Sequence, residues 1–268
     1  MMLVNPYVFA AGAGGGLPAL PNDADIVYWF MADTGVYTDT GGATSATTGQ
    51  TVAHWTNHGS VAQNALQSTS ARRPTFRTGG LNGKPYLECV FATQQHFEDL
   101  TGIPQPSGSS PRYNPRSYAF VVDQVTVTNF PAILGQSNDT GAGKASLYFR
   151  TGTSEQIHCM NSGWRFGNLT NPTVVVVSFY EDGSDRIRVR VNDVAGQDTS
   201  VSSLTSAVTN VEFLRSSGQT GGSGGGFFDG RIYELIVWET KLDGADVTEQ
   251  QDNMALVTDY LYAKYGLT

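Results

Sequence analysis

Paired carboxylates are the first arrangement in this sequence that could do chemistry. A retaining glycosidase places two of them close together, typically as Glu-x-Asp-x-x-Glu on one strand, to serve as nucleophile and acid. No such spacing occurs here, and the glutamates in or beside apolar segments are scattered: Glu155, Glu181, Glu212, Glu234 and Glu239. For Glu234 we favour a hydrogen-bonded strand-end carboxylate over a catalytic acid. The acidic residues therefore predict no glycosidase centre.

A second arrangement is the tripeptide Gln156-Ile157-His158. It resembles a strand of jelly-roll alginate lyases, and the resemblance implies a glutamine that neutralises the uronate and a histidine that abstracts a proton. Those enzymes also carry an Arg-x-Glu strand before this one and a tyrosine-bearing strand after it. Here Tyr148-Phe-Arg150 precedes Gln156, and no Arg-x-Glu strand comes earlier. We interpret the tripeptide as a coincidence and predict that the protein is not an enzyme.

Ligand binding is suggested by the polar segment that contains Trp164. Sugar sites combine an exposed aromatic ring with neighbouring polar groups, so Trp164, Arg165 and Asn161 form a candidate carbohydrate site. A Trp164 folded onto the edge of the domain fits the sequence equally well. Calcium is held by carboxylates and carbonyls, which makes Asn138 and Asp139 candidate ligands, with an ordinary acidic turn as the alternative. No other cofactor is expected.

The composition is typical of a turn-rich β protein, with 31 glycines and only 15% charged residues. The net charge of −8 argues against a nucleic-acid partner, which needs a basic stripe. No apolar run is long enough to span a membrane. The alternation in Arg186-Ile-Arg-Val-Arg190 predicts a solvated strand face. Cys89 and Cys159 lie in apolar surroundings and are predicted to be buried free thiols, although their pairing stays open.

Many short strands must position these residues. From Asp25 onward, short apolar segments alternate with turns rich in Gly, Asn, Asp and Ser, which is typical of a sandwich or barrel. The segment Arg231–Trp238 follows a run of glycines, but no Gly-Lys-Ser/Thr follows, so we predict a strand and not a phosphate loop. Both of its faces are largely apolar, which indicates a central strand buried on both sides. Strict alternation would give one face to Ile232, Glu234, Ile236 and Trp238, and the other to Tyr233, Leu235 and Val237.

One helix is predicted, near the C-terminus. Asp246-Val-Thr-Glu249 has the spacing of a capping box, and Gly266 supplies a stop. Its core-facing residues follow at helical spacing: Val247, Met254, Val257 and Leu261. Three tryptophans in apolar segments are expected in the core: Trp29, Trp55 and Trp238.

The C-terminal third carries a family resemblance. It contains Phe228-Asp-Gly-Arg-Ile-Tyr-Glu-Leu-Ile-Val-Trp, then Lys241-Leu-Asp-Gly-Ala-Asp-Val, then Tyr260-Leu-Tyr-Ala-Lys-Tyr-Gly-Leu267. These motifs, in this order, resemble the end of a concanavalin A-like (laminin G-like) jelly-roll domain. The resemblance implies an all-β, two-sheet antiparallel sandwich over residues 23–268, with one short C-terminal helix.

Residues 1–22 are expected to form a flexible arm with an apolar hook of Leu3, Tyr7 and Phe9, which would pack either on a neighbouring subunit or on the surface of the domain itself. The chain start, together with the single domain, resembles bacteriophage virion proteins. That resemblance implies a capsid decoration, head fibre or tail adhesin on the virion surface, assembled in the host cytoplasm and anchored to other virion proteins through the arm. Such proteins self-associate, commonly as trimers, and a host glycan is a further expected partner. The alternatives from other classes are a polysaccharide lyase or glycanase and a bacterial lectin.

Overall fold

Strand β17 is the centre of the fold. In the computed structural model this strand, Gly230–Trp238, pairs antiparallel with β8 (Ser117–Asp123) along one side and with β1 (Ile26–Met31) and β6 (Tyr86–Cys89) along the other. All but one of its residues are buried, which confirms the predicted two-sided central strand. The structure describes residues 17–100, 117–126, 132–136, 147–150, 156–159, 164–168, 172–181, 185–192, 194–200, 211–215, 226–240, 242 and 247–268.

Three antiparallel sheets are present in the described residues. The eight-stranded sheet runs β15-β14-β13-β8-β17-β6-β5, with β1 also on β17. Its remaining strands are β5 (Thr75–Arg77), β13 (Thr173–Glu181), β14 (Asp185–Val191) and β15 (Val194–Ser200). The six-stranded sheet runs β12-β11-β10-β9-β16-β7. Its strands are β7 (Phe97–Leu100), β9 (Ala132–Gln136), β10 (Leu147–Arg150), β11 (Gln156–Cys159), β12 (Trp164–Asn168) and β16 (Val211–Phe213).

A smaller sheet of three strands lies beside these two. It consists of β2 (Val36–Tyr37), β3 (His54–Trp55) and β4 (Ala65–Leu66), in that order. Four 3₁₀ turns occur at Asp23–Asp25, Ser70–Arg72, Leu81–Gly83 and Phe91–Thr93. The predicted two-sheet antiparallel sandwich is confirmed, and the small sheet is an addition that the sequence analysis did not foresee.

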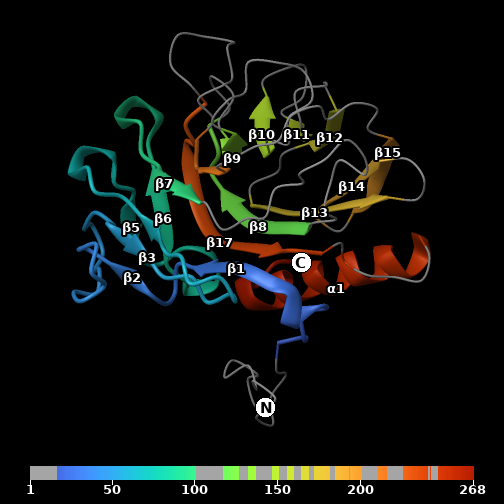
Figure 1. The fold of residues 1–268 in the computed structure, drawn as a ribbon, viewed down its shortest axis with the longest axis horizontal. Coiled ribbons are helices and arrows are strands. Elements are labelled where there is room, and N and C mark those ends of the chain that lie inside the picture. The colour runs from blue at the N-terminus through green and yellow to red at the C-terminus, as the bar shows by residue number, and fades with distance from the viewer. Residues whose placement is uncertain are drawn as a thin grey trace.

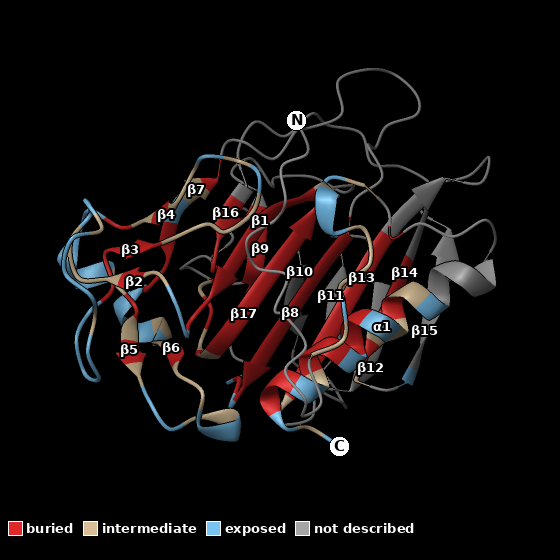
Figure 2. Ribbon diagram, turned by 90° about the horizontal axis from the view of Figure 1, so that it is seen from below, coloured by how far each residue is buried: buried red, intermediate tan, exposed pale blue. Residues whose placement is uncertain are grey.

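Two apolar clusters hold the layers together. The first lies on the inner face and joins β17 and β8 to Phe97 and Phe213 of the six-stranded sheet. The second lies on the outer face, beneath helix α1 (Val247–Tyr265), and contains Trp238, Met254, Val257 and Leu261. Figure 1 shows α1 on one side of the eight-stranded sheet and β9–β12 on the other. In Figure 2 the strands β8 and β13 are buried along their described length, as is β17 apart from Arg231.

The helix ends as predicted. Gly266 has a φ of 63°, and the Leu267 N–H donates to the Tyr262 carbonyl at 3.0 Å, which is a Schellman closure. The three tryptophans predicted for the core, Trp29, Trp55 and Trp238, are all buried. Residues 17–22 also contribute, because Leu17 and Leu20 pack on the outer cluster and the Trp238 Nε1–H donates to the Pro21 carbonyl at 3.1 Å.

Two details of the predicted pattern are wrong. A register shift between Ile232 and Glu234 puts Ile232 in the inner cluster and Tyr233 in the outer one. Strict alternation fails there because a β-bulge adds a residue to one strand. The predicted solvated face of Arg186–Arg190 is also wrong at Arg188, which is 0% exposed. Helix α1 packs against β13 and β15, the strands on either side of β14, and covers this face.

Candidate ligand-binding site

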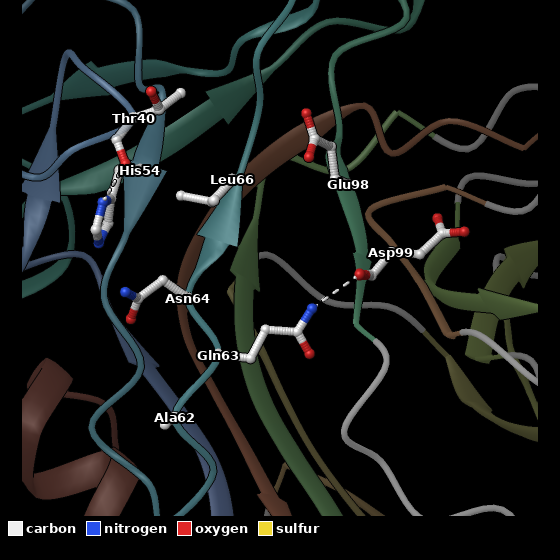
Figure 3. A pocket seen from close by; sticks show the side chains of 8 residues that line it. All are labelled: Thr40, His54, Ala62, Gln63, Asn64, Leu66, Glu98 and Asp99. Carbon is white, nitrogen blue, oxygen red and sulfur yellow. Dashed lines mark hydrogen bonds between the residues drawn. The ribbon is translucent and has the colours of Figure 1, made fainter.

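A pocket of about 270 Å³ opens where the small sheet meets β7. It is lined by Thr40, His54, Ala62, Gln63, Asn64, Leu66, Glu98 and Asp99. Five of these eight side chains carry amide, carboxylate or imidazole groups, and Ala62 and Leu66 supply a small apolar area. Figure 3 shows these residues on the loop after β2, on β3, on β4 and the segment before it, and on β7.

The alternation of the small sheet produces this polar face. His54 pairs with Leu66 and Tyr37, while Trp55 pairs with Ala65 and Val36. Because neighbouring residues of a strand point to opposite faces, Trp55 and its partners enter the inner core, and His54 and Leu66 are left to line the pocket.

The segment between β3 and β4 is fixed to strand β1 by Asn57. The Asn57 Oδ1 accepts hydrogen bonds from the backbone N–H groups of Trp29 and Gly59, both at 2.8 Å. Its Nδ2 donates to the carbonyls of Val27, at 3.0 Å, and Val61, at 2.6 Å. One half-buried amide thus makes four hydrogen bonds to the backbone, two to β1 and two to the segment that follows Asn57. The pocket wall is therefore built on a rigid core strand.

Gly59 allows this close approach. A Cβ at Gly59 would lie 2.4 Å from the Val27 carbonyl oxygen, well inside van der Waals contact. Any larger residue would push the segment away from β1, and with it the pocket residues Gln63 and Asn64.

Gln63 is held at both ends of its carboxamide. Its Oε1 accepts from the hydroxyl of Tyr28, a fully buried residue, at 2.8 Å. Its Nε2 donates to the Asp99 carbonyl at 3.1 Å, the contact drawn in Figure 3. The bond to Asp99 assigns the amide orientation, because a carbonyl can only accept and the opposite orientation would set acceptor against acceptor there; the Tyr28 hydroxyl, which can donate or accept, then donates to Oε1.

Within the described part of the chain, Asn64 and Glu98 each have a hydrogen-bond partner on one side of the side-chain head group only. The Asn57 N–H donates to Asn64 Oδ1 at 3.0 Å, which leaves the Asn64 amide nitrogen as a donor at the pocket. The Ser68 N–H donates to Glu98 Oε1 at 3.0 Å, which leaves the second carboxylate oxygen as an acceptor. The pocket therefore presents a positioned donor and a positioned acceptor.

His54 is committed to the protein. Its Nδ1 lies 3.1 Å from the Thr40 carbonyl and its Nε2 lies 3.2 Å from the Thr56 hydroxyl. The carbonyl can only accept, so Nδ1 carries the proton and Nε2 accepts from Thr56. The loop that follows β2 folds onto this ring, because Gly42 approaches it so closely that a Cβ would lie 2.9 Å from Cε1.

The same loop is closed by Asp39. Its carboxylate accepts from the backbone N–H groups of Ala43, at 3.1 Å, and Thr44, at 2.7 Å. These backbone hydrogen bonds, that of Ala43 first, hold the pKa of Asp39 below its ordinary value of 3.8. The carboxylate keeps Thr40 at the pocket rim.

The residues proposed from the sequence fall elsewhere or outside the described residues. Trp164 and Arg165 are in β12, an edge strand of the six-stranded sheet, and not in a loop; their side chains are outside the described part. Asn161, Asn138 and Asp139 are outside it too, as are three residues of the arm: Leu3, Tyr7 and Phe9. The carbohydrate, calcium and anchoring assignments stay predictions. The pocket residues Gln63, Asn64 and Glu98 were missed, because only the contact of β4 with β7, distant in the chain, brings the first two to the third.

The tripeptide Gln156-Ile157-His158 lies in β11, next to the strand that contains Tyr148 and Arg150. Strand β10 precedes β11 in the chain, but the two are adjacent and antiparallel, with Tyr148 opposite His158 and Arg150 opposite Gln156. Tyr148 and Arg150 come before Gln156 in the chain, yet they lie beside this tripeptide in the sheet. The order of the strands in the chain is therefore no argument against a lyase.

Glu234 has the structural role that was predicted for it. It is fully buried and accepts from Trp29 Nε1 at 2.6 Å and from the Tyr265 hydroxyl at 2.8 Å. The ammonium of Lys264 lies 2.8 Å from its second oxygen, and the Tyr260 hydroxyl lies 3.4 Å from the first. Burial and the Glu234 charge raise the pKa of both tyrosines, so they remain donors.

Among the described residues, no group of three or more His, Cys, Asp or Glu side chains could hold a metal ion. No helix in that part of the chain is long and apolar enough to cross a membrane.

Comparison with known proteins yields distant structural likenesses. No protein-family model matches the sequence, and no curated protein matches it. Trypanosoma rangeli sialidase is similar at 14% identity over 97% of this chain, with a TM-score of 0.45. A Ruminococcus gnavus IT-sialidase CBM40 bound to alpha2,3 sialyllactose is similar at 11% identity over 53% of this chain and 82% of its own, with a TM-score of 0.39. The chain spans about a third of the sialidase, 36% of its length. Likenesses of this extent carry no argument about function, so any functional assignment depends on the site itself.

Proposed function

We propose that this chain is a non-enzymatic, carbohydrate-binding β-sandwich that holds a sugar unit in the pocket between the small sheet and β7. The observation that carries the proposal is the pair of positioned groups at Asn64 and Glu98. A sugar hydroxyl both donates and accepts, and the Asn64 amide donates while the free Glu98 oxygen accepts. Leu66 and Ala62 supply apolar area for the C–H face of the ring.

The size and rigidity of the pocket support the same assignment. Sites for drug-sized ligands begin at roughly 300 Å³, so a pocket of about 270 Å³ suits a single sugar residue at the end of a glycan. Because Asn57 and Gln63 fix the wall before any ligand arrives, little conformational entropy is lost on binding. Isolated sugar sites are weak, and self-association of the chain would raise their avidity.

The proposal extends to a place on the surface of a bacteriophage particle. It rests there on the resemblance of the sequence motifs and on residues 1–22 as an anchoring arm. In that setting the pocket would bind host-surface glycan, and other virion proteins would hold the arm.

Calorimetric titration tests the binding site directly. Sugars that bind on a glycan array are titrated as methyl glycosides into the wild type, Asn64→Ala and Glu98→Ala. We expect each substitution to weaken binding about tenfold or more, since each leaves a ligand group unpaired. Asp252→Asn, an exposed acid on α1, is the matched control and should bind as the wild type. Binding that survives both pocket substitutions and is lost in Trp164→Ala would move the site to β12.

A uronate lyase is the second candidate, favoured by the register that sets Tyr148 opposite His158 and Arg150 opposite Gln156. Incubation with alginate would release unsaturated ends, read as absorbance of the new double bond. Release that disappears in His158→Ala would establish the enzyme and replace the non-enzymatic proposal; no release leaves the binding function in place.

A further inference from the structure

We infer that the pocket selects sugars without a carboxylate, neutral or amino-bearing, and rejects acidic sugars. This inference rests on the proposed function, because it concerns the same pocket. It depends on the charged side chains around β7, which are Glu98, Asp99 and Arg215.

Glu98 and Asp99 bring two carboxylates to the pocket from neighbouring positions of one strand, but they differ in their surroundings. The Asp99 carboxylate lies 2.7 Å from a guanidinium nitrogen of Arg215. Figure 3 shows this carboxylate directed away from Gln63, while the Asp99 carbonyl faces the pocket amide. Asp99 therefore offers the ligand a neutral carbonyl edge and little of its charge.

The cation that neutralises Asp99 is not available to a ligand. Arg215 also lies 3.5 Å from Glu212, a buried carboxylate of β16, so one cation serves two anions. Arg215 is not among the pocket-lining residues. Among the pocket-lining residues, His54 alone has a side chain that can carry positive charge, and its two ring nitrogens are occupied by Thr40 and Thr56.

Glu98 lies at the pocket without a neighbouring cation. It is exposed, and within the described residues no cation forms an ion pair with it. In the same part of the chain its carboxylate accepts one hydrogen bond, from the Ser68 N–H at 3.0 Å. An ionised carboxylate accepts from two adjacent sugar hydroxyls, or from the ammonium of an amino sugar, in short charge-assisted bonds. A ligand carboxylate in the same pocket would meet like charge with no cation to offset it.

The test is a calorimetric comparison of four probes at low salt: methyl α-glucoside, methyl α-galactoside, glucosamine and glucuronic acid. We expect at least one of the first three to bind, and glucuronic acid to bind at least about tenfold more weakly. Because Glu98 is exposed, high salt should narrow that gap by screening. Glu98→Gln keeps a hydrogen-bonding group and removes the charge. It should therefore reduce the difference in affinity between glucuronic acid and the best of the other three probes to about twofold. Asp252→Asn should leave that difference unchanged.

The outcomes separate the two proposals. Preference for glucuronic acid over the neutral probes, or a gap that Glu98→Gln does not change, would overturn the selectivity and leave carbohydrate binding intact. If no probe and no glycan on an array binds, the proposed function itself is contradicted. N-acetylneuraminic acid serves as a second acidic probe, and its binding at the strength of the best neutral sugar would likewise overturn the inference.

Discussion

The carboxylate of Glu234 and the ammonium of Lys264 lie 2.8 Å apart in a space where the two side chains are 0% and 5% exposed. Glu234 belongs to the central strand and Lys264 to the last turn of α1, so the pair joins the helix to the sheet. Lys264 Nζ also lies 3.7 Å from Asp33, which in turn contacts Lys84 at 3.1 Å. The network continues from the buried pair to the protein surface.

Removing one member of the buried pair should be costly. Lys264→Met leaves the Glu234 charge buried without its cation, and we expect a loss of about 3–5 kcal/mol in the free energy of unfolding. Lys84→Met, which removes the exposed partner of Asp33, is the matched control and should cost at most about 1 kcal/mol. Urea unfolding measures both. In the double variant Glu234→Gln, Lys264→Met, stability should partly return; equal losses from the two lysine variants would contradict the role given to burial.

Gly59→Ala should disrupt the pocket wall. The added Cβ would lie 2.4 Å from the Val27 carbonyl oxygen, so the β3–β4 segment must move away from β1. We expect a destabilisation of about 1–3 kcal/mol together with weaker sugar binding. Gly41→Ala, where the nearest atom is a side-chain oxygen of Asp39 at 3.2 Å, is the comparison. Thermal unfolding that ranks Gly41→Ala as the more harmful change would show that the close approach to β1 is not limiting.

Stability should fall in mild acid because of two histidines. Desolvation by burial is the main cause that lowers the pKa of His58 and of His96 below the ordinary 6.5. The unfolded chain therefore binds protons before the folded one, and the stabilisation present above about pH 6.5 is lost as the pH falls toward the folded pKa values. Urea unfolding midpoints measured at about pH 8 and about pH 5.5 give the slope of stability against pH. The double variant His58→Gln, His96→Gln should show a smaller fall, and an unchanged slope would rule these histidines out as its cause.

The thiol of Cys89 should be unreactive in the folded protein. It is buried and free, and burial raises its pKa, so almost no thiolate forms at neutral pH. A Cys159→Ser variant isolates it. A thiol reagent should label this variant only after denaturant is added; rapid labelling of the native variant would mean that the strand β6 opens readily.

Anchoring by the N-terminal arm is tested by deleting residues 2–16. This boundary keeps Leu17 and Leu20, which pack on the outer cluster, so the fold should retain its stability. If the chain is a virion protein, the deletion should abolish incorporation into particles, read by immunoblot of purified phage. Normal incorporation of the shortened chain would remove the anchoring role.

The fold was far more predictable from sequence than the site. The apolar residues on both faces of β17 and the helical spacing of Met254, Val257 and Leu261 are local signals. The first predicts a central strand and the second predicts the buried face of the helix. The bulge in β17 is not visible in the alternation, because both candidate faces are apolar. The burial of Arg188 depends on where α1 lies, which no property of its own strand reveals.

The pocket could not be found from sequence because its parts are distant and individually ordinary. Asn64 comes directly before a strand of two residues. Glu98 lies in β7, where Phe97 and Leu100 of the same strand are in the core. A polar residue at an exposed strand position is the most common pattern in antiparallel sheets. Only the hydrogen bonds of Asn57 and Gln63, which join positions about 30 residues apart, make these residues a site.

Because β1 pairs with β17, the pocket can bind a ligand only after β17 has been synthesised. Every pocket residue lies within the first hundred positions, yet the wall is fixed to β1, and in the described residues the strand partner of β1 is β17. During synthesis the pocket must therefore wait until β17, about 200 residues after β1 in the chain, has been made. A nascent or truncated chain that ends before Gly230 would carry all the ligand-contacting groups and still be unable to hold a ligand.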